Sequence, residues 1–166
     1  MGIKSNSILA SYFNRFGASG TLAPGSYVGD IAIAHYSDPC ISVYRWTSGT
    51  GFGTKYSDPS TLPGWGIAVA FSPDKADIAV AHNTSPHVAA YAWSSGFGTK
   101  YANPSTLPAG FGTGIAFSPD GADLAVGHWT SPYISVYPWS SGFGTKYANP
   151  STLPAGTGRG VAFSPA

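Results

Sequence analysis

Three histidines stand at equivalent positions of an internal repeat, and imidazole is a common general base and metal ligand. They are His35, His82 and His128. Residues at equivalent places in successive repeats are spread through a molecule, whereas the ligands of a zinc ion converge within roughly 3 Å of one point. We therefore predict structural imidazoles with hydrogen bonds at a turn, and we predict no metal site and no cofactor.

All seven acidic residues are aspartates, which limits the acid–base chemistry that the sequence offers. Asp74 and Asp77 lie close together, and Asp120 and Asp123 repeat their spacing. Such pairs could suggest calcium, yet an aspartate in a turn usually accepts hydrogen bonds from its own backbone. We predict that these four residues form turns.

Sequence motifs for catalysis are absent. Residues 96–100 (GFGTK) resemble part of a phosphate-binding loop, but the spacing of that motif fails and no helix-forming segment follows. The sequence has no Gly-x-Ser-x-Gly, His-Glu-x-x-His or Cys-x-x-Cys motif. The sequence therefore predicts a protein that is not an enzyme and that has no catalytic residues.

Aromatic residues remain as candidates for recognition, because Trp and Tyr anchor interfaces and stack on ligands. Trp46, Trp93 and Trp139 recur in every repeat and are predicted to serve packing. Positions that differ between repeats are better candidates for a binding surface. The predicted recognition surface consists of Tyr36, Trp65, His87, Phe111, Trp129 and Tyr133.

The composition indicates the elements that position these residues. The chain has 22 glycines, 14 prolines and 14% aromatic residues, a mixture that favours short strands joined by tight turns. Charged residues make up only 9% of the chain and the net charge is +1. This balance gives no attraction to nucleic acid or to an anionic membrane. We expect an all-β protein, with neither nucleic acid nor membrane insertion among its partners.

A repeat of about 46 residues organises the chain, since residues 94–110 recur unchanged as residues 140–156. Each unit divides into four strand-like pieces separated by turn residues. In the last complete unit the pieces are residues 114–117, 123–128, 133–139 and 145–148. Four short strands in this period are typical of one blade of a β-propeller.

Residues 116–126 (AFSPDGADLAV) and 131–137 (SPYISVY) carry a resemblance to a known family. They resemble WD40-like β-propeller repeats, of the kind found in structural proteins of tailed bacteriophages. The resemblance covers residues 26–166 and implies about three four-stranded blades. The Trp-Asp pair and the Gly-His pair of standard WD40 repeats are missing.

The order of the strands predicts self-association. The repeat begins at the second strand of a blade, near Asp30, and ends at a first strand formed by Val161, Ala162 and Phe163. Three blades cannot close a ring, because propellers have at least about four. We expect this closure strand to complete the first blade of another copy. A dimer would have six blades and a trimer nine.

Residues 1–25 precede the repeat and form a predicted arm and linker. Apolar residues at helical spacing favour a short helix over residues 8–16 that could dock on a partner; they are Ile8, Leu9, Tyr12, Phe13 and Phe16. The alternative is that this segment supplies a strand or covers one end of the ring. No apolar run is long enough for a membrane span or a signal peptide. Cys40 is the only cysteine, so no disulfide forms within the chain.

The resemblance implies a non-enzymatic virion component that is associated with a phage tail or decorates a capsid. Its partners would be itself and, through the arm, other virion proteins. We therefore expect the protein in the virion after assembly in the host cytoplasm. One alternative is a lectin-like propeller that binds surface glycans, and the other is a protein-interaction scaffold.

Overall fold

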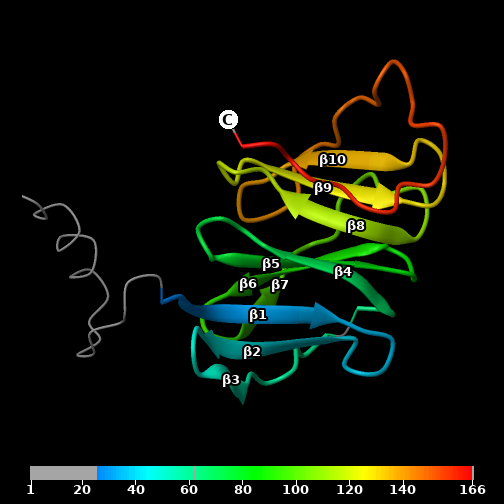
Figure 1. The fold of residues 1–166 in the computed structure, drawn as a ribbon. Helices are drawn as coiled ribbons and strands as arrows, with labels where there is room; N and C mark the ends of the chain where they lie inside the picture. Colours follow the sequence, from blue (N-terminus) through cyan, green and yellow to red (C-terminus); the bar gives the residue numbers. More distant parts are fainter. Residues whose placement is uncertain (1–25, 62, 166) are drawn as a thin grey trace, which may run out of the picture.

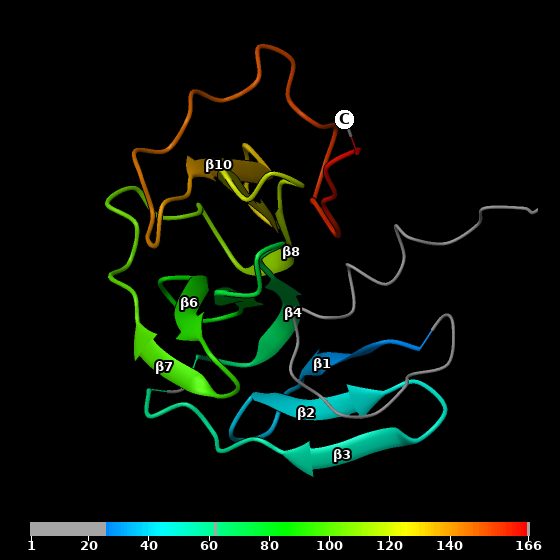
Figure 2. The same cartoon turned by 90° about the vertical axis from the view of Figure 1, so that its left-hand side faces the viewer.

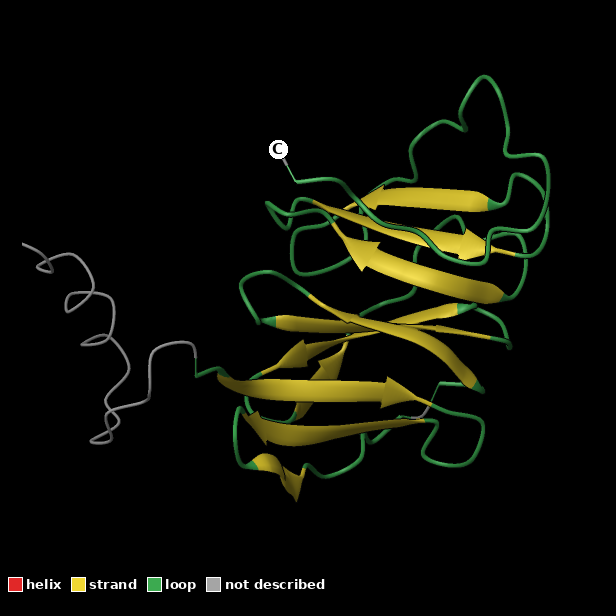
Figure 3. Cartoon of the chain, in the orientation of Figure 1, coloured by secondary structure: helices red, strands yellow, loops and turns green. Residues whose placement is uncertain are grey.

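The structure is a computed structural model and describes residues 26–61 and 63–165. These residues contain ten strands and no helix (Figure 3). They form three antiparallel sheets, here called the first, second and third blades. The first blade contains β1 (Val28–Ala34), β2 (Ile41–Thr47) and β3 (Gly51–Lys55). The second contains β4 (Gly66–Phe71), β5 (Asp77–His82), β6 (Val88–Trp93) and β7 (Phe97–Lys100). The third contains β8 (Gly112–Phe117), β9 (Asp123–His128) and β10 (Ile134–Pro138).

The three blades follow one another in chain order, with the second between the other two (Figures 1 and 2). One apolar core lies between the first and second blades and includes Ile41, Val43 and Val80. Another lies between the second and third blades and includes Val88 and Val126. Because both faces of the second blade are covered, all six residues of β5 are buried.

The turn between the first two strands of a blade is shaped by an aspartate. Asp74 Oδ1 accepts hydrogen bonds from Ser72 Oγ at 2.6 Å and from the backbone N–H of Ala76 at 3.0 Å. These bonds lower the pKa of Asp74. Asp120 makes the same contacts in the third blade. Asp74 and Asp120 therefore form turns, as their sequence positions predict.

The turn between the second and third strands is also repeated. In each blade a cis proline is followed by a residue in the left-handed region, which is Cys40 (φ 64°), His87 (φ 68°) or Tyr133 (φ 69°). The carbonyl of that residue accepts a hydrogen bond from the backbone N–H of His35, His82 or His128 respectively. The structure thus places the residues after the prolines equivalently in all three blades.

The all-β prediction is confirmed, but the described residues form part of a propeller and not a closed one. Residues 161–163, predicted as a strand, form no strand pairing within the described residues, although Gly160 and Val161 lie next to Gly114 of β8. The predicted fourth strand at 145–148 is also wrong, since only an isolated bridge joins Trp139 to Phe143. In the second blade that strand starts at Phe97, where a tight turn brings it opposite Trp93. The predicted arm, residues 1–25, lies outside the described residues.

Candidate functional site

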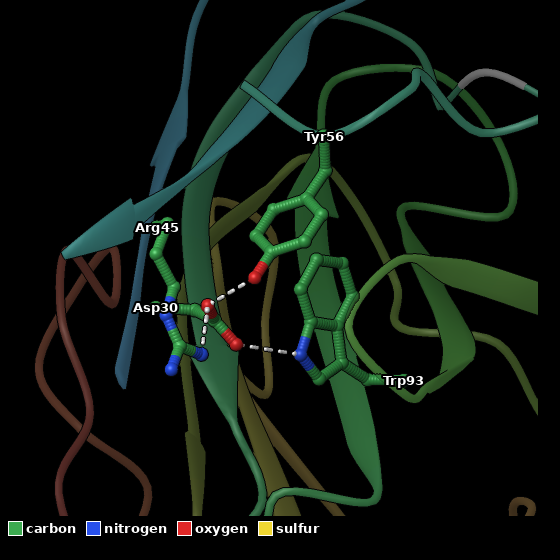
Figure 4. Close-up of polar contacts among 4 residues, drawn as sticks. All are labelled: Asp30, Arg45, Tyr56 and Trp93. Carbon is green, nitrogen blue, oxygen red and sulfur yellow. Dashed lines mark hydrogen bonds and ion pairs between the residues drawn. The ribbon is translucent and has the colours of Figure 1, made fainter. Parts of the chain in front are cut away.

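Asp30 is the centre of a polar contact between the first and second blades (Figure 4). Its Oδ1 accepts a hydrogen bond from the Tyr56 hydroxyl at 2.7 Å, and its Oδ2 accepts one from Trp93 Nε1 at 3.1 Å. Arg45 lies 3.6 Å from Oδ1 and is half exposed. Tyr56 belongs to the same blade as Asp30, whereas Trp93 belongs to the next one. The contact therefore joins adjacent blades.

The same contact recurs between the second and third blades, where it is buried. Asp77 is 4% exposed and accepts bonds from the Tyr101 hydroxyl at 2.6 Å and from Trp139 Nε1 at 2.8 Å. Burial, together with the neighbouring Asp77 carboxylate, raises the pKa of Tyr101 to about 12. The prediction that Asp77 is a turn former is wrong. Asp77 is the first residue of β5, and its carboxylate reaches Trp139 of the neighbouring blade.

The repeated histidines pair with serines inside the blades. His128 is fully buried, with Nε2 3.1 Å from Ser135 Oγ and Nδ1 2.7 Å from the carbonyl of Thr130. Burial lowers the pKa of His128. His35 Nε2 lies 3.0 Å from Ser42 Oγ. Both serines are buried, so neither is placed to attack a substrate and these pairs serve the fold.

His82 departs from this pattern because the second blade has Ala89 where the other blades have a serine. Its Nδ1 lies 3.3 Å from Thr84 Oγ1, but its buried Nε2 has no hydrogen-bond partner within the described residues. Burial lowers the pKa of His82 to about 4. His82 is therefore a neutral imidazole with one unsatisfied nitrogen.

Four exposed aromatic residues lie at the blade junctions, on the side of the cis-proline turns. Tyr36 and Trp65 pack edge to face with ring centroids 5.7 Å apart. At the next junction Phe111 lies 6.1 Å from Trp129 and 5.9 Å from the His87 ring. These two groups contain five residues in all, and we call them together the aromatic row.

The aromatic row contains one imidazole, that of His87. His87 Nδ1 is buried and has no hydrogen-bond partner in the described part of the chain. The ring is half-buried and lies against Phe111, while Phe111 and Trp129 themselves are exposed. A partly accessible imidazole beside exposed rings can hold a ligand and exchange a proton with it.

The structure thus brings five of the six predicted recognition residues into the aromatic row. Tyr133, the sixth, is half-buried at the corresponding turn of the third blade and makes no ring contact with the others in the described residues. The predicted docking residues Ile8, Leu9, Tyr12, Phe13 and Phe16 lie outside the described residues. The Asp–Tyr–Trp contact was missed, although the regular recurrence of these three residue types in the sequence could have indicated it.

Metal ligands do not converge in the described part of the chain, where no group of three His, Cys, Asp or Glu side chains could hold an ion. Cys40 is buried. The pKa of its thiol is raised mainly by this burial and further by the nearby Asp38 charge. No described helix is long and apolar enough to cross a membrane.

Comparison with solved structures assigns a class of fold to this arrangement. No protein-family model matches the chain, and no curated protein matches its sequence. Solved structures do match, and two of them are lactonases with a propeller-like fold. Likeness at this level of identity shows the fold.

Two of these neighbours are enzymes by description. One is a periplasmic gluconolactonase from Pseudomonas aeruginosa, with a TM-score of 0.53 and 18% identity over 77% of this chain and 39% of the neighbour. The other, from Bacteroides uniformis, is assigned as a 6-phosphogluconolactonase and has a TM-score of 0.50 and 17% identity over 77% of this chain and 40% of that one. The chain thus spans about two fifths of each neighbour.

These neighbours correct two predictions made from the sequence. A phage virion component was expected, with a lectin or a scaffold as alternatives, but the neighbours are lactonases. The expectation of a non-enzymatic protein is overturned by the same finding. A virion location has no support either, since one neighbour is periplasmic. The error arose because short repeat motifs report blade packing, which proteins of unrelated function share.

Proposed function

We propose that the chain contributes to a lactone hydrolase, with the aromatic row as the surface that binds a sugar-derived lactone. The observation that carries the proposal is the placement of His87 among exposed rings at a blade junction. The lactonase description of both fold neighbours supports the same class of reaction.

The rings of the aromatic row suit a pyranose-derived lactone. Flat aromatic surfaces contact the C–H face of such a ring, while its hydroxyl groups stay in water. Phe111 and Trp129 present exposed, tilted faces 6.1 Å apart. No residue of the aromatic row carries a permanent positive charge, which favours an uncharged lactone over a phosphorylated one.

In this proposal His87 acts as the general base through Nε2, since Nδ1 is buried. It takes a proton from a water molecule as the water oxygen bonds to the lactone carbonyl carbon. The carbonyl is then re-formed as the ring C–O bond breaks, and the proton passes to the leaving oxygen. The product is the open hydroxy acid, which ionises in water. No oxidant or reductant is needed.

The test is hydrolysis of D-glucono-1,5-lactone by the full chain, followed in a pH-stat against the spontaneous rate. We expect a rate above the buffer, a loss of at least tenfold in His87→Gln, and a higher KM in Trp129→Ala. Leu153→Ala, which removes another exposed apolar side chain, is the matched control and should keep the wild-type rate. A wild-type rate equal to that of buffer would refute the proposal, and an unchanged rate in His87→Gln would refute the role of the imidazole.

A further inference from the structure

Adjacent blades meet through a junction that the chain makes twice, and each junction centres on a tryptophan of the later blade. Trp93 donates to Asp30 and packs edge to face against Tyr56 at 5.1 Å and Phe71 at 5.5 Å. Trp139 makes the equivalent contacts with Asp77, with Tyr101 at 5.3 Å and with Phe117 at 5.4 Å. The aspartate and tyrosine belong to the earlier blade. The phenylalanine is the last residue of the first strand of the later blade.

One half of a third junction is exposed on the first blade. Trp46 stands where Trp93 and Trp139 stand in the other blades, but among the described residues it has no aspartate partner. Ile31 and Ile33 are 39% and 54% exposed, whereas their equivalents Ile78 and Val80 are fully buried. An apolar hollow of about 520 Å³ lies over Ile31, Ile33, Tyr44 and Phe52.

The complementary half is exposed at the other end of the blade stack. Asp123 Oδ1 accepts a bond from Tyr147 at 3.0 Å, while within the described residues no tryptophan donates to Oδ2. Tyr147 is 49% exposed, although its equivalents Tyr56 and Tyr101 are half-buried. This half therefore offers an aspartate and a tyrosine, which are the two junction partners that Trp46 lacks on the first blade.

Residues 158–163 lie where the first strand of a following blade would begin. The Gly158 N–H donates to the His128 carbonyl at 3.1 Å, as the Gly66 N–H donates to the His35 carbonyl at 3.0 Å. A Cβ on Gly158 would meet the Tyr133 carbonyl, just as one on Gly66 would meet the Cys40 carbonyl. Phe163 occupies the sequence position of Phe71 and Phe117.

We propose that a second copy of this chain docks head to tail at these two faces, so that two copies form a ring of six blades. Residues 161–163 of one copy pair with β1 of the other, and Asp123 Oδ2 accepts a hydrogen bond from the partner's Trp46. The register follows that of β4 on β5, where Val69, Ala70 and Phe71 lie opposite Val80, Ala79 and Ile78. Val161, Ala162 and Phe163 then lie opposite the partner's Ile33, Ala32 and Ile31.

A second copy fits better than an unrelated protein because the chain itself carries both halves of one junction. Each copy has three aspartates and three tryptophans in the repeated positions but makes only two such pairs within its described residues. A head-to-tail contact supplies the third pair in both directions, and it also covers the open edge of β1, which is prone to nonspecific pairing. The inference is independent of the proposed lactonase activity.

The first test is the native mass of the full chain by light scattering. We expect twice 17.1 kDa. Three times this mass would support the junction but overturn the six-blade ring. A chain that is monomeric both intact and without residues 1–25 would overturn the proposal. A chain that is monomeric when intact but dimerises after deletion of residues 1–25 would show that those residues cover the β1 face.

A mixing experiment separates loss of the junction from loss of folding. Ile33→Asp disables the β1 face and Phe163→Asp disables the closing strand, so each variant alone should be monomeric. A mixture of the two variants should form a dimer, because one junction stays intact. This junction joins the β1 face of the Phe163→Asp chain to residues 161–163 of the Ile33→Asp chain. Leu153→Asp, an exposed apolar position outside both faces, should stay dimeric. Failure of the folded variants to recombine would overturn the proposal.

The register is tested with a disulfide between copies. Residues opposite each other in antiparallel strands have Cα atoms about 4.5–5.5 Å apart, which a disulfide can span. In a Cys40→Ala background, Ile33→Cys combined with Val161→Cys should give covalently linked chains on a non-reducing gel. Pairing Ile33→Cys with Leu153→Cys is the matched control and should not. Equal cross-linking in both would contradict the register.

Discussion

The unsatisfied nitrogen of His82 gives the sharpest prediction about stability. The second blade has Ala89 where the first and third have Ser42 and Ser135, and those serines lie 3.0 and 3.1 Å from the Nε2 atoms of their histidines. His82 Nε2 is buried without a partner in the described residues. Ala89→Ser should therefore supply the missing hydrogen bond.

The expected gain follows from the usual worth of a buried hydrogen bond. A net hydrogen bond contributes about 1 kcal/mol, and an unsatisfied buried group costs about 1–3 kcal/mol. We expect Ala89→Ser to raise the free energy of unfolding by about 1 kcal/mol. In a chain of this length the midpoint of thermal unfolding should rise by roughly 2–4 °C.

Urea denaturation and thermal unfolding at pH 7.5 measure this effect. Ser135→Ala is the reverse control, because it leaves His128 Nε2 without a partner and should lower stability by about 1–3 kcal/mol. Ala90→Ser, which places a hydroxyl in the apolar core next to Ala89, should also destabilise. If Ala89→Ser lowered stability as Ala90→Ser does, the reasoning from the repeated pair would be refuted.

Three further predictions concern single positions. Lys75→Gly should raise the free energy of unfolding by about 0.5–1 kcal/mol in a urea titration, because Lys75 has φ 63° where the third blade has Gly121. Gly112→Ala should lower the unfolding midpoint by several degrees in a thermal scan, because its Cβ would meet the His87 carbonyl. Stability measured in urea should fall by about 3 kcal/mol between pH 6.5 and 4, because unfolded His82 binds a proton in this range while the folded form, with a pKa of about 4, does not. A flat profile, or one unchanged in His82→Gln, would contradict the assignment.

Much of the fold was predictable from local signals. The second blade formed where the repeat placed it, and the turns at Asp74 and Asp120 followed from the hydrogen-bonding habit of aspartate. Five of the six predicted recognition residues lie in the aromatic row, and their role in binding stays a prediction. Such features depend on residues close together in the chain.

The sequence predictions failed where a contact joins distant residues. Asp77 looks like a turn residue, yet its carboxylate meets Trp139, which is 62 residues away. Residues 161–163 carry the pattern of a strand, but a strand forms only when a neighbouring strand makes its backbone hydrogen bonds, and these residues pair with no strand within the described residues. The function was also misjudged, because repeat motifs describe packing and say little about a site.

The sequence by itself determined the all-β class, the period of the blades and the positions of their turns, since these follow from glycine, proline and the alternation of apolar residues. Only the tertiary structure decided which side chains meet between blades. It revealed that Asp30 and Asp77 bind tryptophans, that His82 lacks a partner, and that Ile33 is exposed where Val80 is buried. The physical reason is that a repeat makes residues equivalent, while the neighbours of each copy decide whether they are buried, paired or free to bind.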